Sequence, residues 1–118
     1  EKPVPQMSIE ELTAKIAELL SLIQKLQAEL LLLNYKFEKF LYLGQKSDDI
    51  KHLQAFLKSQ GQEIYPEGLT TGYFGNLSFT AVKKFQLKYQ IINSAESPGA
   101  GFVGPKTRAK INELLGKQ

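Results

Sequence analysis

The chain of 118 residues contains no cysteine, no tryptophan and a single histidine, His52. Without cysteine there is no thiolate nucleophile, no disulfide bond and no cysteine-ligated metal. A single histidine excludes every site that needs two imidazoles, including the common catalytic zinc sites. No other group of residues forms a catalytic pattern. We therefore expect a protein that is not an enzyme, with no catalytic residue, no metal and no cofactor.

Long apolar runs are also absent. The longest uninterrupted aliphatic run covers residues 30–33, whereas a membrane-spanning helix needs about 20 apolar residues. We therefore expect no membrane span. The sequence begins with Glu1 rather than methionine, and we expect an exported protein whose signal peptide has been removed. A cloned N-terminus is the alternative that the sequence leaves open.

Strong charge of either sign is lacking, since the net charge is only +3. Residues 1–43 carry five lysines against six glutamates, and residues 44–118 carry ten basic against six acidic side chains. The second part would be attracted mildly to an anionic polymer. Nucleic acid usually requires a denser basic stripe, so we expect no nucleic-acid partner. A cell-wall polymer with carboxylates and phosphates fits the balance at least as well.

The first third of the chain has the pattern of one long helix. Residues 1–7 contain two prolines and are expected to form an extended tail. Ser8 and Glu11 then have the spacing of a capping box. Neither glycine nor proline occurs between Ser8 and Leu43. This predicts a helix within residues 8–43, roughly 33 residues and about 50 Å long.

Apolar residues in this segment recur at alternating steps of three and four, the heptad spacing of a coiled coil. The seam consists of Ile9, Leu12, Ile16, Leu19, Ile23, Leu26, Leu30, Leu33, Phe37 and Phe40. Leu20 and Leu22 flank it, and Leu31 and Leu32 lie outside it. The apolar surface is too wide for a two-stranded coil. We expect self-association through Ile9, Leu12, Ile16, Leu19, Leu20, Ile23, Leu26, Leu30 and Leu33, the alternative being a helix that folds back on its own domain.

Shorter helices punctuated by glycine follow Gly44. The pattern predicts helices at 48–60, 77–89 and 105–115, the first capped by Ser47 and the second by Asn76 or Ser78. Pro105 suits the first turn of the third helix. The segment between Gln62 and Gly75 is rich in turn residues and is expected to form loops, with a short β-like pair at most.

Two segments of this second part repeat each other with an offset of 29 residues. Residues 72–78 (the first hook) and 101–107 (the second hook) both have the form Gly-aromatic-apolar-Gly-x-x-Ser/Thr and both lead into a helix. The glycines permit a tight turn, and the apolar residue between them is expected to enter the core. The hydroxyl residue then braces the first helical turn.

With the pairs Asp49-Ile50, Leu53-Gln54, Ala81-Val82 and Phe85-Gln86, the two hooks make residues 41–116 resemble the peptidoglycan-binding domain found beside many bacterial wall hydrolases. Thr71 and Ala100 stand where that family has aspartate. The resemblance implies an all-α three-helix module that holds peptidoglycan without cleaving it. A wall hydrolase is disfavoured because the chain lacks catalytic groups.

Candidate ligand-binding residues follow from the hooks. Tyr73 and Phe102 precede the inward residue of each hook and are expected to point outward, where aromatic faces suit an acetamido sugar. Buried glutamines must satisfy their amides, so Gln54 and Gln86 either bind ligand or, as we favour, serve the loop backbone. The full candidate set is Tyr65, Thr71, Tyr73, Gln86, Tyr89 and Phe102.

These observations predict an all-α fold with an extended tail (1–7), a long amphipathic helix (8–43) and a compact three-helix domain with two glycine-rich hooks (44–118). The predicted function is non-catalytic binding of peptidoglycan, both glycan and stem peptide, by an extracellular or cell-wall-associated homo-oligomer. The alternative is a structural subunit of an extracellular filament, tube or layer, in which the same domain serves as a packing module.

Overall fold

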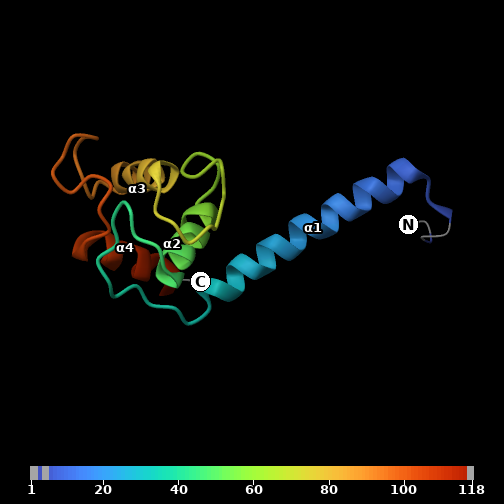
Figure 1. The fold of residues 1–118 in the computed structure, drawn as a ribbon, viewed down its shortest axis with the longest axis horizontal. Helices are drawn as coiled ribbons and strands as arrows, with labels where there is room; N and C mark the ends of the chain where they lie inside the picture. Colours follow the sequence, from blue (N-terminus) through green and yellow to red (C-terminus); the bar gives the residue numbers. More distant parts are fainter. Residues whose placement is uncertain (1–2, 4–5, 117–118) are drawn as a thin grey trace.

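A computed structural model describes residues 3 and 6–116 of the chain, so part of the expected tail, residues 1, 2, 4 and 5, lies outside the described residues. The described residues form four helices and no strand, which confirms the all-α prediction: α1 (Ile9–Leu32), α2 (Asp48–Ser59), α3 (Asn76–Lys88) and α4 (Pro105–Gly116). Helices α2, α3 and α4 pack into a compact domain, and α1 projects from it as a rod (Figure 1). The molecule measures 58 × 27 × 25 Å.

Helix α1 begins as predicted and ends earlier. The amide of Glu11 donates to Ser8 Oγ at 3.2 Å, and Ser8 N donates to Glu11 Oε1 at 3.3 Å, which confirms the capping box. The predicted continuation to Leu43 is wrong, because the helix stops at Leu32 and Asn34 adopts a left-handed conformation with φ 58°. Asparagine tolerates this conformation better than most residues.

The early end of α1 has a cause in the core. Phe37 and Leu41 are only 2% and 3% exposed, and burying each is worth roughly 1.5–3 kcal/mol. A helix running to Leu43 would carry these side chains away from the domain as part of the rod. The two phenylalanines that continue the heptad spacing, Phe37 and Phe40, therefore belong to the domain and not to the seam.

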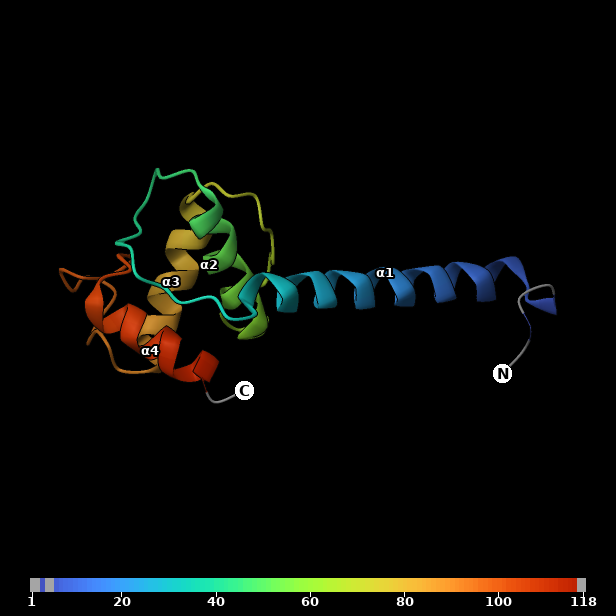
Figure 2. The same cartoon turned by 90° about the horizontal axis from the view of Figure 1, so that it is seen from below.

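The rod does not fold back on its own domain. No side chain of α1 is buried, and the helix extends away from the domain in both perpendicular views (Figures 1 and 2). Only its last turns approach the domain, where Leu31 and Leu32 are partly buried and Leu32 packs against the core. The two leucines that fall outside the heptad seam thus serve the junction with the domain.

Residues 33–47, here called the strap, join α1 to α2 and bind three parts of the domain. Phe37 N donates to Asn112 Oδ1 at 2.8 Å, and Asn112 Nδ2 donates back to Phe37 O at 2.9 Å, which ties the strap to α4. Leu41 pairs with Val103 in the second hook. Further along, Phe74 N donates to Gln45 O at 2.8 Å in the first hook.

The helices of the domain begin largely as the sequence indicates. Ser47 caps α2 through the amide of Ile50, and Pro105 is the first residue of α4, so both predictions are confirmed. The predicted side-chain cap of α3 is wrong: Gly75 is the N-cap and makes no such bond. Residues 62–75 form loops and turns without a β-like pair of their own, since the isolated bridges among the described residues join the strap to the hooks.

Candidate ligand-binding surface

Each hook is closed by one buried glutamine. In the first hook, Gln54 of α2 accepts from the amide of Gly72 at 2.9 Å and donates to Tyr73 O at 2.8 Å and to Ser78 Oγ at 3.0 Å. Gly72 has φ +85°, which only glycine adopts readily. The glutamine therefore ties both ends of the turn to α2.

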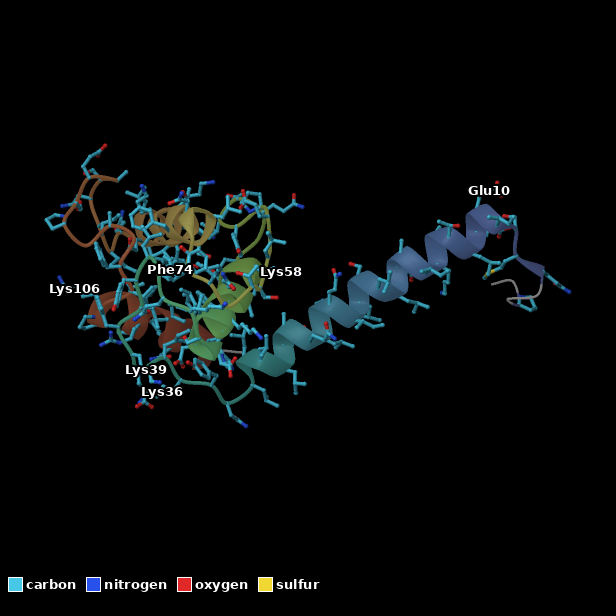
Figure 3. All side chains as sticks on the ribbon, viewed as in Figure 1. Glu10, Lys36, Lys39, Lys58, Phe74 and Lys106 are labelled. Atoms are coloured by element: carbon cyan, nitrogen blue, oxygen red, sulfur yellow. The ribbon has the colours of Figure 1, made fainter. Side chains whose placement is uncertain are left out.

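The second hook repeats this arrangement with different residues. Gln86 of α3 accepts from the amide of Gly101 at 2.8 Å and donates to Phe102 O at 2.9 Å and to Thr107 Oγ1 at 3.0 Å. Gly101 also has φ +85°. The inward residues, Phe74 and Val103, are fully buried, and Phe74 points into the domain in Figure 3.

The two hooks differ at the positions that depart from the family pattern. In the first hook, Tyr73 N donates to Thr71 Oγ1 at 3.1 Å. The second hook has Ala100 at that position, and Phe102 N donates instead to the main-chain carbonyl of Gly99 at 3.2 Å. A backbone oxygen thus replaces the missing side-chain acceptor. Both turns remain satisfied, and no buried side-chain N or O atom in the described part of the chain lacks a partner.

Tyr73 and Phe102 both reach the surface. Tyr73 is 50% exposed and Phe102 is 40% exposed. Tyr73 borders a shallow pocket of about 260 Å³, together with Thr71 and Tyr65. Phe102 borders a separate groove of about 590 Å³, which also includes Gln86. The structure therefore divides the predicted site residues between two surfaces, one at each hook.

Three of the predicted site residues are buried or partly buried, and their side chains contact other parts of the domain. Tyr65 is 3% exposed, and its hydroxyl donates to Leu69 O at 2.5 Å. Gln86 is 1% exposed, and its amide is used within the second hook, as the structural interpretation of the two glutamines requires. Tyr89 is partly buried, lies 4.9 Å from Phe85 between ring centroids, and borders neither hook surface.

The strap adds exposed aromatic residues that the sequence interpretation missed. Phe40 is 48% exposed and its ring stacks on Phe102 with centroids 5.9 Å apart and planes 10° apart. Tyr42 is 42% exposed and lies 5.5 Å from Phe40. The alternation of Phe40 and Tyr42 around the buried Leu41 is the signal of an extended segment. The heptad spacing concealed it.

A polar cluster fixes the start of the strap beside α2. The Tyr35 hydroxyl donates to the Asp49 carboxylate, Lys39 Nζ lies 3.1 Å from Asp49 Oδ2, and the Tyr35 ring stacks on His52 at 3.8 Å. Burial and this hydrogen bond raise the pKa of Tyr35, and the hydrogen bond from Tyr35 lowers the pKa of Asp49. The cluster holds the strap to α2, and His52 lies half-buried against the Tyr35 ring.

Among the described residues, no group of histidine, cysteine, aspartate or glutamate side chains is arranged to hold a metal ion. None of the described helices is both long and apolar enough to cross a membrane. Comparison with family models matched residues 46–111 to a family described as a putative peptidoglycan binding domain. The matched segment spans α2, α3, both hooks and the first part of α4. A comparison with curated proteins gave no match.

Proposed function

The chain belongs to the putative peptidoglycan-binding domain family, and on that premise we propose that it holds peptidoglycan at the bacterial cell wall without cleaving it. The family match carries this proposal. The domain binds through shallow surfaces at its two hooks, where exposed aromatic faces lie beside main-chain groups. Thr71 and Tyr73 contribute at the first hook, and Phe102 contributes at the second.

The second part of the proposal is that α1 makes the protein a homo-oligomer. The large apolar side chains along the rod are exposed in the isolated chain: Ile9 is 79% exposed, Leu30 is 70% exposed and Leu19 is 47% exposed. A continuous apolar surface of this kind is unfavourable in a monomer and typical of an interface. An isolated helix also gains most of its stability from packing, so association would stabilise the rod as well.

Two measurements on the full-length chain test the two parts separately. The double variant Ile16→Lys/Ile23→Lys places unpaired charge in the apolar surface and is expected to be a monomer by light scattering. The same variant is expected to sediment with purified insoluble peptidoglycan, since the hooks are unchanged. A control without peptidoglycan measures sedimentation caused by assembly alone. If neither the unmodified chain nor the double variant binds peptidoglycan, the binding proposal is overturned. If the double variant is still an oligomer, the role of α1 is overturned.

The exposed rod also supports the alternative of a structural subunit in a filament, tube or layer. In that case contacts between copies would be open-ended and would include the domain as well as α1. Negative-stain microscopy of the full-length chain separates the two proposals. Discrete particles of uniform size favour the wall-binding oligomer, and extended polymers favour the structural subunit.

A further inference from the structure

The exposed aromatic residues of the strap and of the second hook form one continuous surface, here called the aromatic strip (Phe40, Tyr42 and Phe102). Each ring lies within 6 Å of its neighbour, measured between centroids, and each side chain is between 40% and 48% exposed. The core of the domain is filled by other side chains, so the strip is not needed for internal packing. Neighbouring aromatic rings that remain in water usually mark a binding surface.

Polar groups border the strip on one side. Phe40 and Phe102 form part of the wall of the 590 Å³ groove, and Asn93, Ser97 and Lys106 contribute its polar edge. An amino sugar has an apolar ring face and a rim of hydroxyl and acetamido groups. The strip offers aromatic faces for the first and the groove offers donors and acceptors for the second.

The position of the strip agrees with a role that is separate from oligomerisation. Lys106, at the edge of the groove, lies at the end of the molecule opposite Glu10 of the rod (Figure 3). Rods that pack side by side would therefore leave this end of each domain accessible. The two hooks differ in the ring that covers their second glycine. In the first hook, Gly75 is covered by Tyr73 of the same turn. In the second hook, the matching Gly104 is approached by Phe40 of the strap.

We propose that the aromatic strip and its groove are the subsite for the glycan strand of peptidoglycan, as distinct from the stem peptide. This inference rests on the proposed function. The subsite depends on two strap residues, Phe40 and Tyr42, that lie outside the matched family segment. It is therefore a property of this chain and its strap.

The test uses the full-length chain in the Ile16→Lys/Ile23→Lys background, with three probes: insoluble peptidoglycan, soluble glycan strands stripped of stem peptides, and the free stem peptide. The variant Phe40→Ala/Phe102→Ala is expected to lose affinity for stripped glycan by about tenfold per ring. Phe40→Tyr/Phe102→Tyr is expected to retain it. Leu87→Ala, which truncates an exposed apolar residue outside the strip, serves as the matched control.

Circular dichroism checks that each variant remains folded. If Phe40→Ala/Phe102→Ala does not fold, Tyr42→Ser gives the same test, because Tyr42 binds Gln45 through its main-chain amide and keeps that contact. Binding of the unmodified strip to insoluble peptidoglycan but not to stripped glycan would overturn the inference and leave the proposed function standing. Undiminished glycan binding by the alanine variant would do the same. Absence of binding to all three probes would overturn both. A change in assembly alone, measured without the lysine substitutions, would assign the strip to contacts between copies.

Discussion

The two hooks have the same internal frame and different surfaces. Gln54 and Gln86 make matching hydrogen bonds, and both first glycines have φ +85°. Yet the first hook satisfies its turn through the hydroxyl of Thr71, and the second does so through the carbonyl of Gly99. The inward-facing glutamines are thus the shared part of the two hooks. The oxygen that accepts from the aromatic residue's amide can come from a side chain or from the main chain, and the outer surfaces are free to differ.

Removing either glutamine is expected to have the largest effect on this frame. Gln54→Ala and Gln86→Ala each leave a buried glycine amide unpaired, remove a donor to the hook and open a cavity, so each should lower the free energy of unfolding by about 3–5 kcal/mol. Chemical denaturation measures the change. Gln62→Ala, at an exposed position, should change stability by less than about 0.5 kcal/mol. A large effect in one hook and a negligible effect in the other would show that the frames are not equivalent.

Alanine substitution of the first glycine of each hook, Gly72 or Gly101, should lower the stability of the protein by different amounts. Alanine at either position is strained by about 1–2 kcal/mol because of its positive φ. At Gly101 the new Cβ would also lie 2.1 Å from Phe79 Cε1, whereas at Gly72 it meets the flexible Lys51 side chain at 3.2 Å. Gly101→Ala is therefore expected to cost about 1–3 kcal/mol more than Gly72→Ala.

Gly99→Ala is the control for this pair, since a Cβ there meets nothing within 4 Å. Thermal or chemical unfolding of the three variants under the same conditions gives the ranking. Equal losses for Gly72→Ala and Gly101→Ala would mean that Phe79 moves aside at no cost.

The acceptor in the first hook should have a moderate effect. Thr71→Ala removes the oxygen that accepts from Tyr73 N and is expected to lower the free energy of unfolding, measured by chemical denaturation, by about 1 kcal/mol. Thr71→Ser keeps that oxygen and should leave the free energy of unfolding nearly unchanged. The amide resonance of Tyr73 in NMR spectra reports the bond directly. If Thr71→Ala changes neither the free energy of unfolding nor the Tyr73 amide resonance, a main-chain carbonyl accepts from Tyr73 N in its place, as Gly99 O does for Phe102 N in the second hook.

Acid should weaken the contact of the strap with α2 more than its contact with the second hook, and this is the smallest expected effect. The folded-state pKa of Asp49 is below its ordinary value, chiefly because Tyr35 donates to it. Its contribution to stability is therefore present above about pH 3.9, the unfolded-state value, and is lost as the pH falls through the folded-state pKa. The strap contact with the second hook, Leu41 with Val103, involves no titratable side chain.

An NMR titration of the Asp49 carboxyl group checks this prediction. Tyr35→Phe removes the hydroxyl and keeps an aromatic ring beside His52, so the pKa of Asp49 should rise toward its ordinary value. An unchanged titration in Tyr35→Phe would assign the lowered pKa to Lys39 instead, the other donor to this carboxylate.

Patterns with strong local causes could be predicted from the sequence. The capping box at Ser8, the cap at Ser47, the position of Pro105 at the start of α4 and the inward residues of the hooks depend on neighbouring residues alone. The sequence also favours a structural role for the two glutamines, both of which accept from a glycine amide of a hook. The inward residues and Pro105 bear on the candidate site, because the two hooks lead directly into the starts of α3 and α4.

The strap could not be predicted because a tertiary interaction overrides a local pattern there. Phe37 and Phe40 continue the heptad steps, and no glycine or proline marks the end of α1. The helix nevertheless ends at Leu32, since Phe37 and Leu41 are buried in a core built largely from residues far along the chain. The same error hid Phe40 and Tyr42, the strap's contribution to the candidate surface. Single residues such as Asn112, which holds Phe37 from 75 positions away, leave no trace in sequence spacing.

The clasp between Phe37 and Asn112 has a mechanical consequence. Any pull transmitted along α1 enters the domain through residues 33–37 and meets the contact of Tyr35 with Asp49 of α2 and the two hydrogen bonds of Asn112 before it reaches either hook. A tethered molecule under load would therefore yield first at these contacts with α2 and α4, with the two glutamine-closed turns still intact.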